Sequence, residues 1–249
     1  MRVAILGAGG FGTSLAIVLG GKGLDVRLWA READLCDTMN AARENVRYLP
    51  GFQLPESVTA VPRIEEALEG AQMVVGATPS QVAREIFGRA APLLPEGIPI
   101  VTVSKGIEEG TLLLPTEVLE DVLPGRLHPF LAALSGPSFA REVAAGVPTA
   151  VTIASHAEKV AQAVQEAFSA PTFRCYTSPD VIGVQLGGAL KNVIAIGAGI
   201  ADGLGFGNNG RAALITRGLA EISRVAVERG ANPITLSGLA GLGDLVLTC

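Results

Sequence analysis

Two lysines stand where an ammonium group could take part in catalysis. Lys105 follows the apolar run Ile100–Ser104, which predicts a strand, and open α/β sheets bind ligands at the carboxyl ends of their strands. Lys191 lies in a strongly apolar helical segment, one turn beyond Gly187 and Gly188, which would leave space for a ligand on that helix face. A lysine largely removed from water transfers its proton more easily. The alternative is that Lys191 extends along the helix to solvent.

A glycine-rich turn near the amino terminus predicts a dinucleotide site. The segment Gly7–Gly12 has the pattern G-x-G-x-x-G and stands between an apolar strand and a helix. In that context Gly7 permits the tight turn, Gly9 lets the backbone approach a pyrophosphate, and Gly12 lets the helix pack on the strand. The N–H groups at the start of the helix supply an anion site. The alternative is a chance turn, because the chain has 31 glycines, but the strand–turn–helix context disfavours it.

Arg31 predicts which nicotinamide cofactor is preferred. It follows the second strand about twenty residues beyond the glycines, where an NAD-selective site carries Asp or Glu for the ribose hydroxyls. A guanidinium at this point can pair with a 2′-phosphate, so the sequence favours NADPH over NADH. The alternative is that Arg31 begins the following helix as a solvated residue.

Composition and charge exclude several classes of protein. Of the 249 residues, 49% are hydrophobic and 17% are charged, and the formal net charge is -5 without any block of like charge. This composition argues against disorder and against a nucleic-acid or anionic-membrane partner. Cys36, Cys175 and Cys249 lie far apart and predict reduced thiols in a cytoplasmic protein. His128 and His156 have no neighbours at ligand spacing, so we expect no metal site and no histidine proton chemistry.

The elements that must position these residues follow an α/β pattern. Apolar runs predict strands at Arg2–Leu6, Asp25–Trp29, Val58–Val61, Met73–Ala77, Pro99–Ser104, Phe130–Ser135, Thr149–Ala154 and Thr172–Tyr176. Helical spacing covers Thr13–Gly20, Val181–Ile200, Asn209–Arg229 and Pro233–Leu242. We therefore predict a Rossmann-like, doubly wound, mainly parallel sheet over residues 1–178, followed by an all-helical second domain over residues 179–249.

The sequence at each end of the chain supports a separate prediction. The apolar run Val3–Leu19 has the composition of a signal peptide or a membrane span, but glycines interrupt it and only Arg2 precedes it as a charge. We expect a strand, a turn and a helix there, and no membrane span. The stretch Gly243–Cys249 stops without a polar tail, and we expect the sequence to be truncated inside the second domain.

Several motifs together resemble the bacterial-type NAD(P)-dependent glycerol-3-phosphate dehydrogenases. They are Gly7–Gly12, Trp29–Arg31, Val103–Gly106, Ser135–Ala140, Gly183–Leu186 with Lys191-Asn192, and Gly241–Asp244. The resemblance implies reversible reduction of dihydroxyacetone phosphate to sn-glycerol 3-phosphate, which supplies glycerophospholipid synthesis in the cytoplasm. It implies NADPH or NADP as cofactor, with NADH or NAD also accepted, and it is compatible with a homodimer. A substrate site is expected between the two domains.

The resemblance also implies roles for single residues. The expected cofactor contacts are Gly7, Gly9, Gly10, Phe11, Gly12, Arg31, Tyr48 on the adenine side, Pro79 near the nicotinamide, Lys105 and Ala140. The expected substrate contacts are Lys105, Gly136, Ser138, Lys191, Asn192 and Asp244. Lys191 would be the general acid/base, and Lys105, Asp244 and Thr248 would complete the catalytic set. Without the resemblance, Gly136–Ser138 is typical of an ordinary turn, and Asp244 and Thr248 of a polar loop between helices.

One departure and two rival functions complete the expectations. In the family, a Ser-Arg-Asn stretch that grips the substrate phosphate follows the equivalent of Thr248-Cys249, and this chain stops before it. A related two-domain reductase of β-hydroxyacids or of a ketopantoate-like substrate would share the lysine and the dinucleotide domain, and dependence on the substrate phosphate distinguishes it. A noncatalytic dinucleotide sensor would have no use for both Lys105 and Lys191.

Overall fold

The computed structural model describes residues 1–249. Its centre is an eight-stranded sheet with the order β3-β2-β1-β4-β5-β6-β7-β8, parallel throughout except where β6 meets β7. The strands are β1 (Arg2–Leu6), β2 (Asp25–Trp29), β3 (Val58–Val61), β4 (Met73–Gly76), β5 (Ile100–Thr102), β6 (Leu131–Ser135), β7 (Thr149–Ala154) and β8 (Phe173–Ser178). All eight predicted strands are present, with ends that differ from the prediction by up to two residues.

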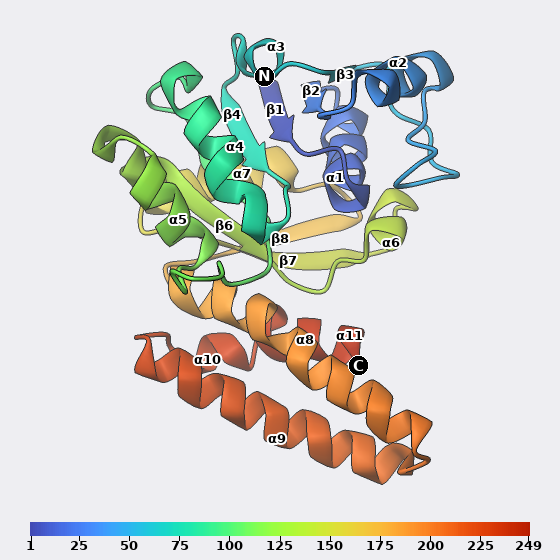
Figure 1. Cartoon of the computed structure of the whole chain (residues 1–249), viewed down its shortest axis with the longest axis vertical. Coiled ribbons are helices and arrows are strands. Elements are labelled where there is room, and N and C mark those ends of the chain that lie inside the picture. The colour runs from blue at the N-terminus through green and yellow to red at the C-terminus, as the bar shows by residue number, and fades with distance from the viewer.

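Helices cover both faces of this sheet, which explains why the central strands β4, β5 and β6 are buried along their whole length. They are α1 (Gly10–Gly21), α2 (Ala33–Ala42), α6 (Ala140–Ala144) and α7 (Glu158–Phe168) on one face, and α3 (Ile64–Leu68), α4 (Ala83–Ala90) and α5 (Pro115–Val122) on the other. In β1, Val3 and Ile5 enter the first core while Ala4 and Leu6 enter the second. The doubly wound α/β fold class is confirmed (Figure 1).

The strand order places a ligand crevice beside β1. The chain runs from β1 outward to β3 and then returns to β4 on the other side of β1, so the loops after β1 and β4 leave the sheet in different directions. Ligands of open α/β sheets bind at this point, outside the carboxyl ends of the strands. Leu6 pairs with Gly76, so the glycine-rich turn and the segment from Ala77 lie next to each other.

The carboxyl-terminal part is a helical unit built on a long hairpin. Its helices α8 (Val181–Gly203) and α9 (Gly207–Glu228) lie side by side in Figure 1, and α10 (Pro233–Leu236) and α11 (Asp244–Thr248) follow them. The Asp180 carboxylate caps α8 by accepting from the Gly183 N–H at 2.8 Å. α8 has the length and composition to cross a membrane, but half of its most apolar stretch is buried, and a core helix passes the same test.

The helix predicted over Pro233–Leu242 is wrong in its extent. The chain forms the short helix α10, breaks at Ser237-Gly238, makes a π-helical turn over Leu239–Gly243, and enters α11. The physical reason is close backbone packing at Gly241, where a Cβ would overlap the carbonyl oxygen of Leu236. An apolar pattern with helical spacing does not reveal such a turn.

Candidate active site

The glycines of the turn after β1 divide into packing positions and one open position. Gly7 has φ +124°, and a Cβ there would overlap the Ala77 carbonyl oxygen. A Cβ on Gly12 would overlap the carbonyl oxygen of Gly7, so α1 packs directly on the turn. A Cβ on Gly9, in contrast, would meet nothing within 4 Å. Gly9 is also the N-cap of α1, so its open side adjoins the N–H groups at that helix end.

This turn opens into a cleft that gathers most of the predicted cofactor residues. One part has a volume of about 350 Å³ and includes Gly7, Gly9, Arg31, Tyr48 and Pro79. A second part of about 390 Å³ shares Gly9 and Ala77–Pro79 with the first and adds Phe11, Lys105, Ser138 and Ala140. A Cβ on Gly10 would lie 3.7 Å from the Ala140 Cβ, so Gly10 lies beside the cleft as well. The cleft therefore runs from Arg31 to Lys105.

The Arg31 end of the cleft is highly exposed. The Arg31 side chain is 80% exposed, and its Nη2 atom lies 3.4 Å from the Glu32 Oε1 atom. α2 begins at Ala33, so Arg31 precedes this helix by two residues, and its side chain is solvated as the alternative holds. Glu85 and Arg89 of α4 line the same part of the cleft and were not predicted. Their positions in the sequence indicate only an exposed helix face, so no local signal pointed to the cleft.

At the other end of the cleft, three elements bring two lysines onto one carboxylate. The Lys105 Nζ atom, just after β5, donates to Asp244 Oδ2 at 2.7 Å, and the Lys191 Nζ atom of α8 donates to Asp244 Oδ1 at 2.5 Å. Asp244 is the first residue of α11 and is fully buried, and Lys191 is 6% exposed. The alternative in which Lys191 extends to solvent is therefore wrong.

The environment of Lys105 makes its ammonium easier to deprotonate than that of an ordinary lysine. Burial lowers the pKa of Lys105, the Asp244 carboxylate opposes this by favouring the charged form, and the neighbouring Lys191 lowers the pKa further. The Lys105 Nζ atom also donates to the Gly136 carbonyl oxygen at 2.9 Å. Gly136 has φ +142°, a left-handed conformation that favours glycine, and the Ser138 hydroxyl donates to the same carbonyl at 2.9 Å. The Gly136–Ser138 turn therefore holds Lys105.

Two predicted residues lie outside this cluster. Asn192 is exposed on α8, next to Lys191 in sequence but on a different side of the helix. The Thr248 hydroxyl donates to the Asp244 backbone carbonyl at 2.6 Å, one turn back on α11, rather than to either lysine. Asp244 and Thr248 both belong to α11, so the alternative of a polar loop between helices is wrong.

The expectation that Gly187 and Gly188 leave space for a ligand is also wrong. A Cβ on Gly187 would overlap the carbonyl oxygen of Ala240, in the π-helical turn. A Cβ on Gly188 would lie 2.6 Å from the Ser135 Oγ atom and 3.4 Å from the Cγ atom of Lys105. Protein atoms fill both positions, so these glycines let α8 approach β6 and the segment before α11.

Comparison with known proteins matches both parts of the chain. Residues 2–161 match the family described as NAD-dependent glycerol-3-phosphate dehydrogenase N-terminus, and residues 180–249 match the corresponding C-terminus family. The glycerol-3-phosphate dehydrogenase [NAD(P)+] of Myxococcus xanthus is 60% identical over 249 residues, which are 100% of this chain and 74% of that protein. That of Anaeromyxobacter sp. strain K is 58% identical, over 100% of this chain and 75% of that protein.

A solved structure agrees with these relatives. The crystal structure of glycerol-3-phosphate dehydrogenase from Coxiella burnetii superposes with a TM-score of 0.93 at 44% sequence identity, covering 100% of this chain and 75% of that one. The chain thus spans about three quarters of the length of these relatives. Sequence, domain order and fold agree, and the chain belongs to the NAD-dependent glycerol-3-phosphate dehydrogenase family.

Proposed function

We propose that this chain reduces dihydroxyacetone phosphate to sn-glycerol 3-phosphate with NADPH, reversibly, and accepts NADH as well. The observation that carries the proposal is the meeting of Lys105 and Lys191 on the buried Asp244 carboxylate, at one end of the dinucleotide cleft. The family membership supports an NAD(P)-dependent oxidoreductase, because the curated relatives are named glycerol-3-phosphate dehydrogenase [NAD(P)+]. The β-hydroxyacid and ketopantoate alternatives have no comparable support.

The residues of the cleft fit a nicotinamide dinucleotide. The open side of Gly9 and the N–H groups of α1 would bind the pyrophosphate, and Arg31 with Tyr48 would contact the adenosine end. Pro79 and Ala140 would then border the nicotinamide, in the part of the cleft that also contains Lys105. When bound, the nicotinamide supplies or receives the hydride.

Lys191 would act as the general acid during reduction. The negative charge that develops on the C2 oxygen of the substrate would be neutralised by a proton from the Lys191 ammonium, and the same amine would accept the proton in the reverse reaction. Asp244 holds the Lys191 Nζ atom by its Oδ1 atom, so that it orients the donor. Lys105, fixed between Asp244 and the Gly136 carbonyl, would stabilise the same developing charge.

Several finer assignments belong to the same proposal. We assign residues 1–178 to the dinucleotide domain and residues 179–249 to the helical domain, since β8 ends at Ser178 and α8 begins at Val181. The Ser138 side chain borders the cleft beside Lys105 and would contact the substrate. Asn192, exposed beside Lys191 on α8, would contact the substrate, and Thr248, bonded to the Asp244 carbonyl, would complete the catalytic set. The free thiols of Cys36, Cys175 and Cys249 support a cytoplasmic location.

Substrate-dependent oxidation of NADPH tests this function. In a protein that also carries the family's Ser-Arg-Asn stretch, we expect turnover with dihydroxyacetone phosphate and little or none with dihydroxyacetone, because that stretch grips the substrate phosphate. Ketopantoate and a β-keto acid serve as substrates of the rival class. Efficient turnover of either, with no activity on dihydroxyacetone phosphate, would overturn the proposal.

A further inference from the structure

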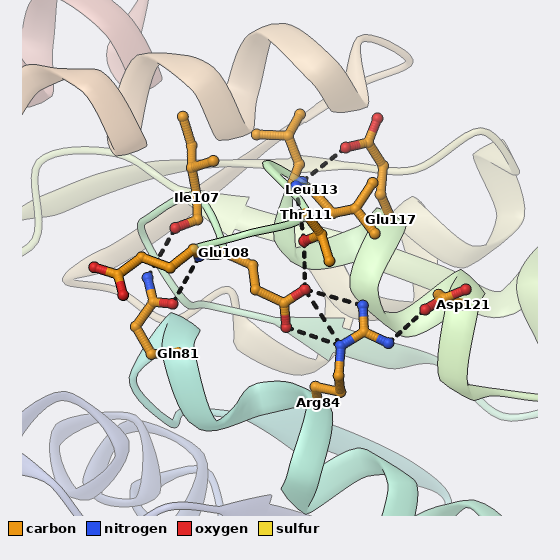
Figure 2. A network of polar contacts seen from close by, with 10 residues as sticks. Gln81, Arg84, Ile107, Glu108, Thr111, Leu113, Glu117 and Asp121 are labelled. Carbon is orange, nitrogen blue, oxygen red and sulfur yellow. Dashed lines mark hydrogen bonds and ion pairs between the residues drawn. The ribbon is translucent and has the colours of Figure 1, made fainter.

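An ion pair outside the cleft holds the loop that carries Lys105. Glu108, three residues after Lys105, is 7% exposed, and its carboxylate accepts from Arg84 of α4 at 3.0 Å through Nε and 2.9 Å through Nη2. The Thr111 hydroxyl donates to the Glu108 Oε2 atom at 2.5 Å, and Arg84 also pairs with Asp121 of α5 (Figure 2). The Arg84 and Thr111 donors lower the pKa of Glu108, which keeps the carboxylate charged.

A second contact fixes the backbone on both sides of Glu108. The Gln81 side chain donates from Nε2 to the Ile107 carbonyl at 2.8 Å and accepts at Oε1 from the Glu109 N–H at 2.9 Å (Figure 2). Gly106 lies against the same segment, because a Cβ there would overlap the Ser80 Oγ atom. Ser80 and Gln81 directly follow Pro79, the residue expected near the nicotinamide. The loop is therefore bonded to the segment that borders the cofactor.

The opposite side of the loop belongs to the helical domain. Ile107 and Leu114 pack in the apolar cluster of that domain, which includes Leu186 and Ile222. Just beyond the loop, the Thr116 N–H donates to Gln185 Oε1 at 2.9 Å. The segment from Lys105 to Leu114 is thus fixed on one side to the dinucleotide domain and on the other to the helical domain.

We propose that Gln81, Arg84 and Glu108 are positioning residues, which hold the Lys105 loop so that the Lys105 ammonium stays on Asp244 and Gly136. These three residues are the loop clamp. A lysine has a long flexible stem, so the place of its ammonium depends on a fixed backbone. Isolated surface ion pairs contribute little, but the forked Arg84 contact to a carboxylate that also accepts from Thr111 forms a network. The catalytic part of this inference rests on the role proposed above for Lys105.

The first test reads the position of Lys105 without using activity. Acylation of each lysine at a series of pH values, followed by mass spectrometry, gives the pH midpoint of its reactivity. Burial is the largest influence on the pKa of Lys105 and lowers it, so release of the loop into water should raise that pKa by more than loss of the Asp244 contact lowers it. We expect Glu108→Gln and Gln81→Ala to move the Lys105 midpoint to higher pH. Lys22, bonded to carbonyls at the end of α7, is the internal reference and should not change.

The two variants protect the test against a folding defect. Glu108→Gln removes charge from a buried network, whereas Gln81 is exposed, so Gln81→Ala removes two hydrogen bonds without opening a cavity. The matched control is Glu66→Gln, which makes the same chemical change in the exposed Arg63–Glu66 pair. It should leave the Lys105 midpoint at its original value. An unchanged Lys105 midpoint in a folded Gln81→Ala protein, or in a folded Glu108→Gln protein, would overturn the loop clamp.

The second test measures catalysis with the same variants. We expect kcat/KM for dihydroxyacetone phosphate to fall on the order of 10-fold to 10²-fold, the range for a catalytic group displaced by about 1 Å, while the Kd for NADPH changes little. Arg84→Lys keeps the positive charge but loses the two-pronged guanidinium contact to Glu108. Its kcat/KM should therefore lie between that of Arg84→Met and that of the unaltered protein. A shifted Lys105 midpoint with unchanged turnover would leave the clamp standing and remove Lys105 from the proposed function.

Discussion

Two glycine-rich regions of this protein have opposite surroundings. In the turn Gly7–Gly12, Gly9 faces open space at the amino-terminal end of α1. On α8, Gly187 and Gly188 face the Ala240 carbonyl and the Ser135 hydroxyl, and no space remains. Gly9 of the first region leaves room for a ligand, whereas Gly187 and Gly188 of the second make room for other parts of the protein.

The same contrast holds for the charged groups beside each region. Arg31, at the end of the open cleft, is 80% exposed and has a single partner at 3.4 Å. Lys191 and Asp244, beside the closed region, are buried and bonded at 2.5 Å. We infer that the open region binds the dinucleotide and that the closed region keeps the reacting groups in place. Substitutions in the two regions should therefore affect binding and chemistry separately.

The largest difference between the effect on turnover and the effect on cofactor binding is expected for Lys191→Ala. Loss of a positioned acid/base should lower kcat on the order of 10²-fold to 10⁴-fold, because no other group in the cluster can supply the proton from the same place. The affinity for NADPH should be nearly unchanged, since the proposed contacts are in the open cleft. Lys191→Met keeps an unbranched stem and isolates the loss of the ammonium. Near-normal turnover of either variant would make Lys105 the leading candidate for the acid.

Gly9→Val should produce the reverse effect. Its φ of -68° suits any residue and a Cβ would meet no protein atom, so the fold should be kept. The side chain would occupy the place of the pyrophosphate, and we expect NADPH to bind at least about 10²-fold more weakly by calorimetry. Unchanged NADPH affinity would show that the loop is only a turn.

Gly187→Ala should affect stability instead of binding. Its Cβ would overlap the Ala240 carbonyl, and such overpacking costs about 1–3 kcal/mol of unfolding free energy. For a chain of this size that corresponds to roughly 2–4 °C in Tm for each kcal/mol. The control is Gly199→Ala on the same helix, where a Cβ meets nothing within 4 Å. The better helix propensity of alanine should raise the unfolding free energy of this variant by up to about 1 kcal/mol. Equal Tm values for the two variants would contradict the close packing at Gly187.

The smallest effect is expected for Arg31→Glu, because Arg31 is so exposed. A carboxylate beside the proposed 2′-phosphate should weaken NADPH binding about tenfold more than NADH binding, which corresponds to about 1.4 kcal/mol. Competition binding with both cofactors measures the difference, and Glu32→Gln, which leaves the guanidinium in place, is the control. An equal loss for NADPH and NADH would remove Arg31 from cofactor selection.

The fold was largely predictable because its signals are local. Short β-rich runs identified all eight strands, and the strand–turn–helix setting identified Gly7 and Gly12 as packing positions and Gly9 as the open one. The segment from Pro233 was not predictable in the same way. Its apolar pattern suits one helix, but the contact of Gly241 with the Leu236 backbone decides that the chain turns there and starts α11 at Asp244.

By itself, the sequence determined the two-part α/β and helical organisation, the dinucleotide turn and the lysines worth testing, because each depends on neighbouring residues. Only the tertiary structure decided that Lys105 and Lys191 share Asp244, which lies 139 and 53 residues away from them in the chain. It also decided that protein atoms fill the space beside Gly187 and Gly188, and that Arg84 of α4 reaches Glu108 in the loop after β5. Such contacts arise when separate elements pack together, and no local pattern in the chain encodes which side chains then meet.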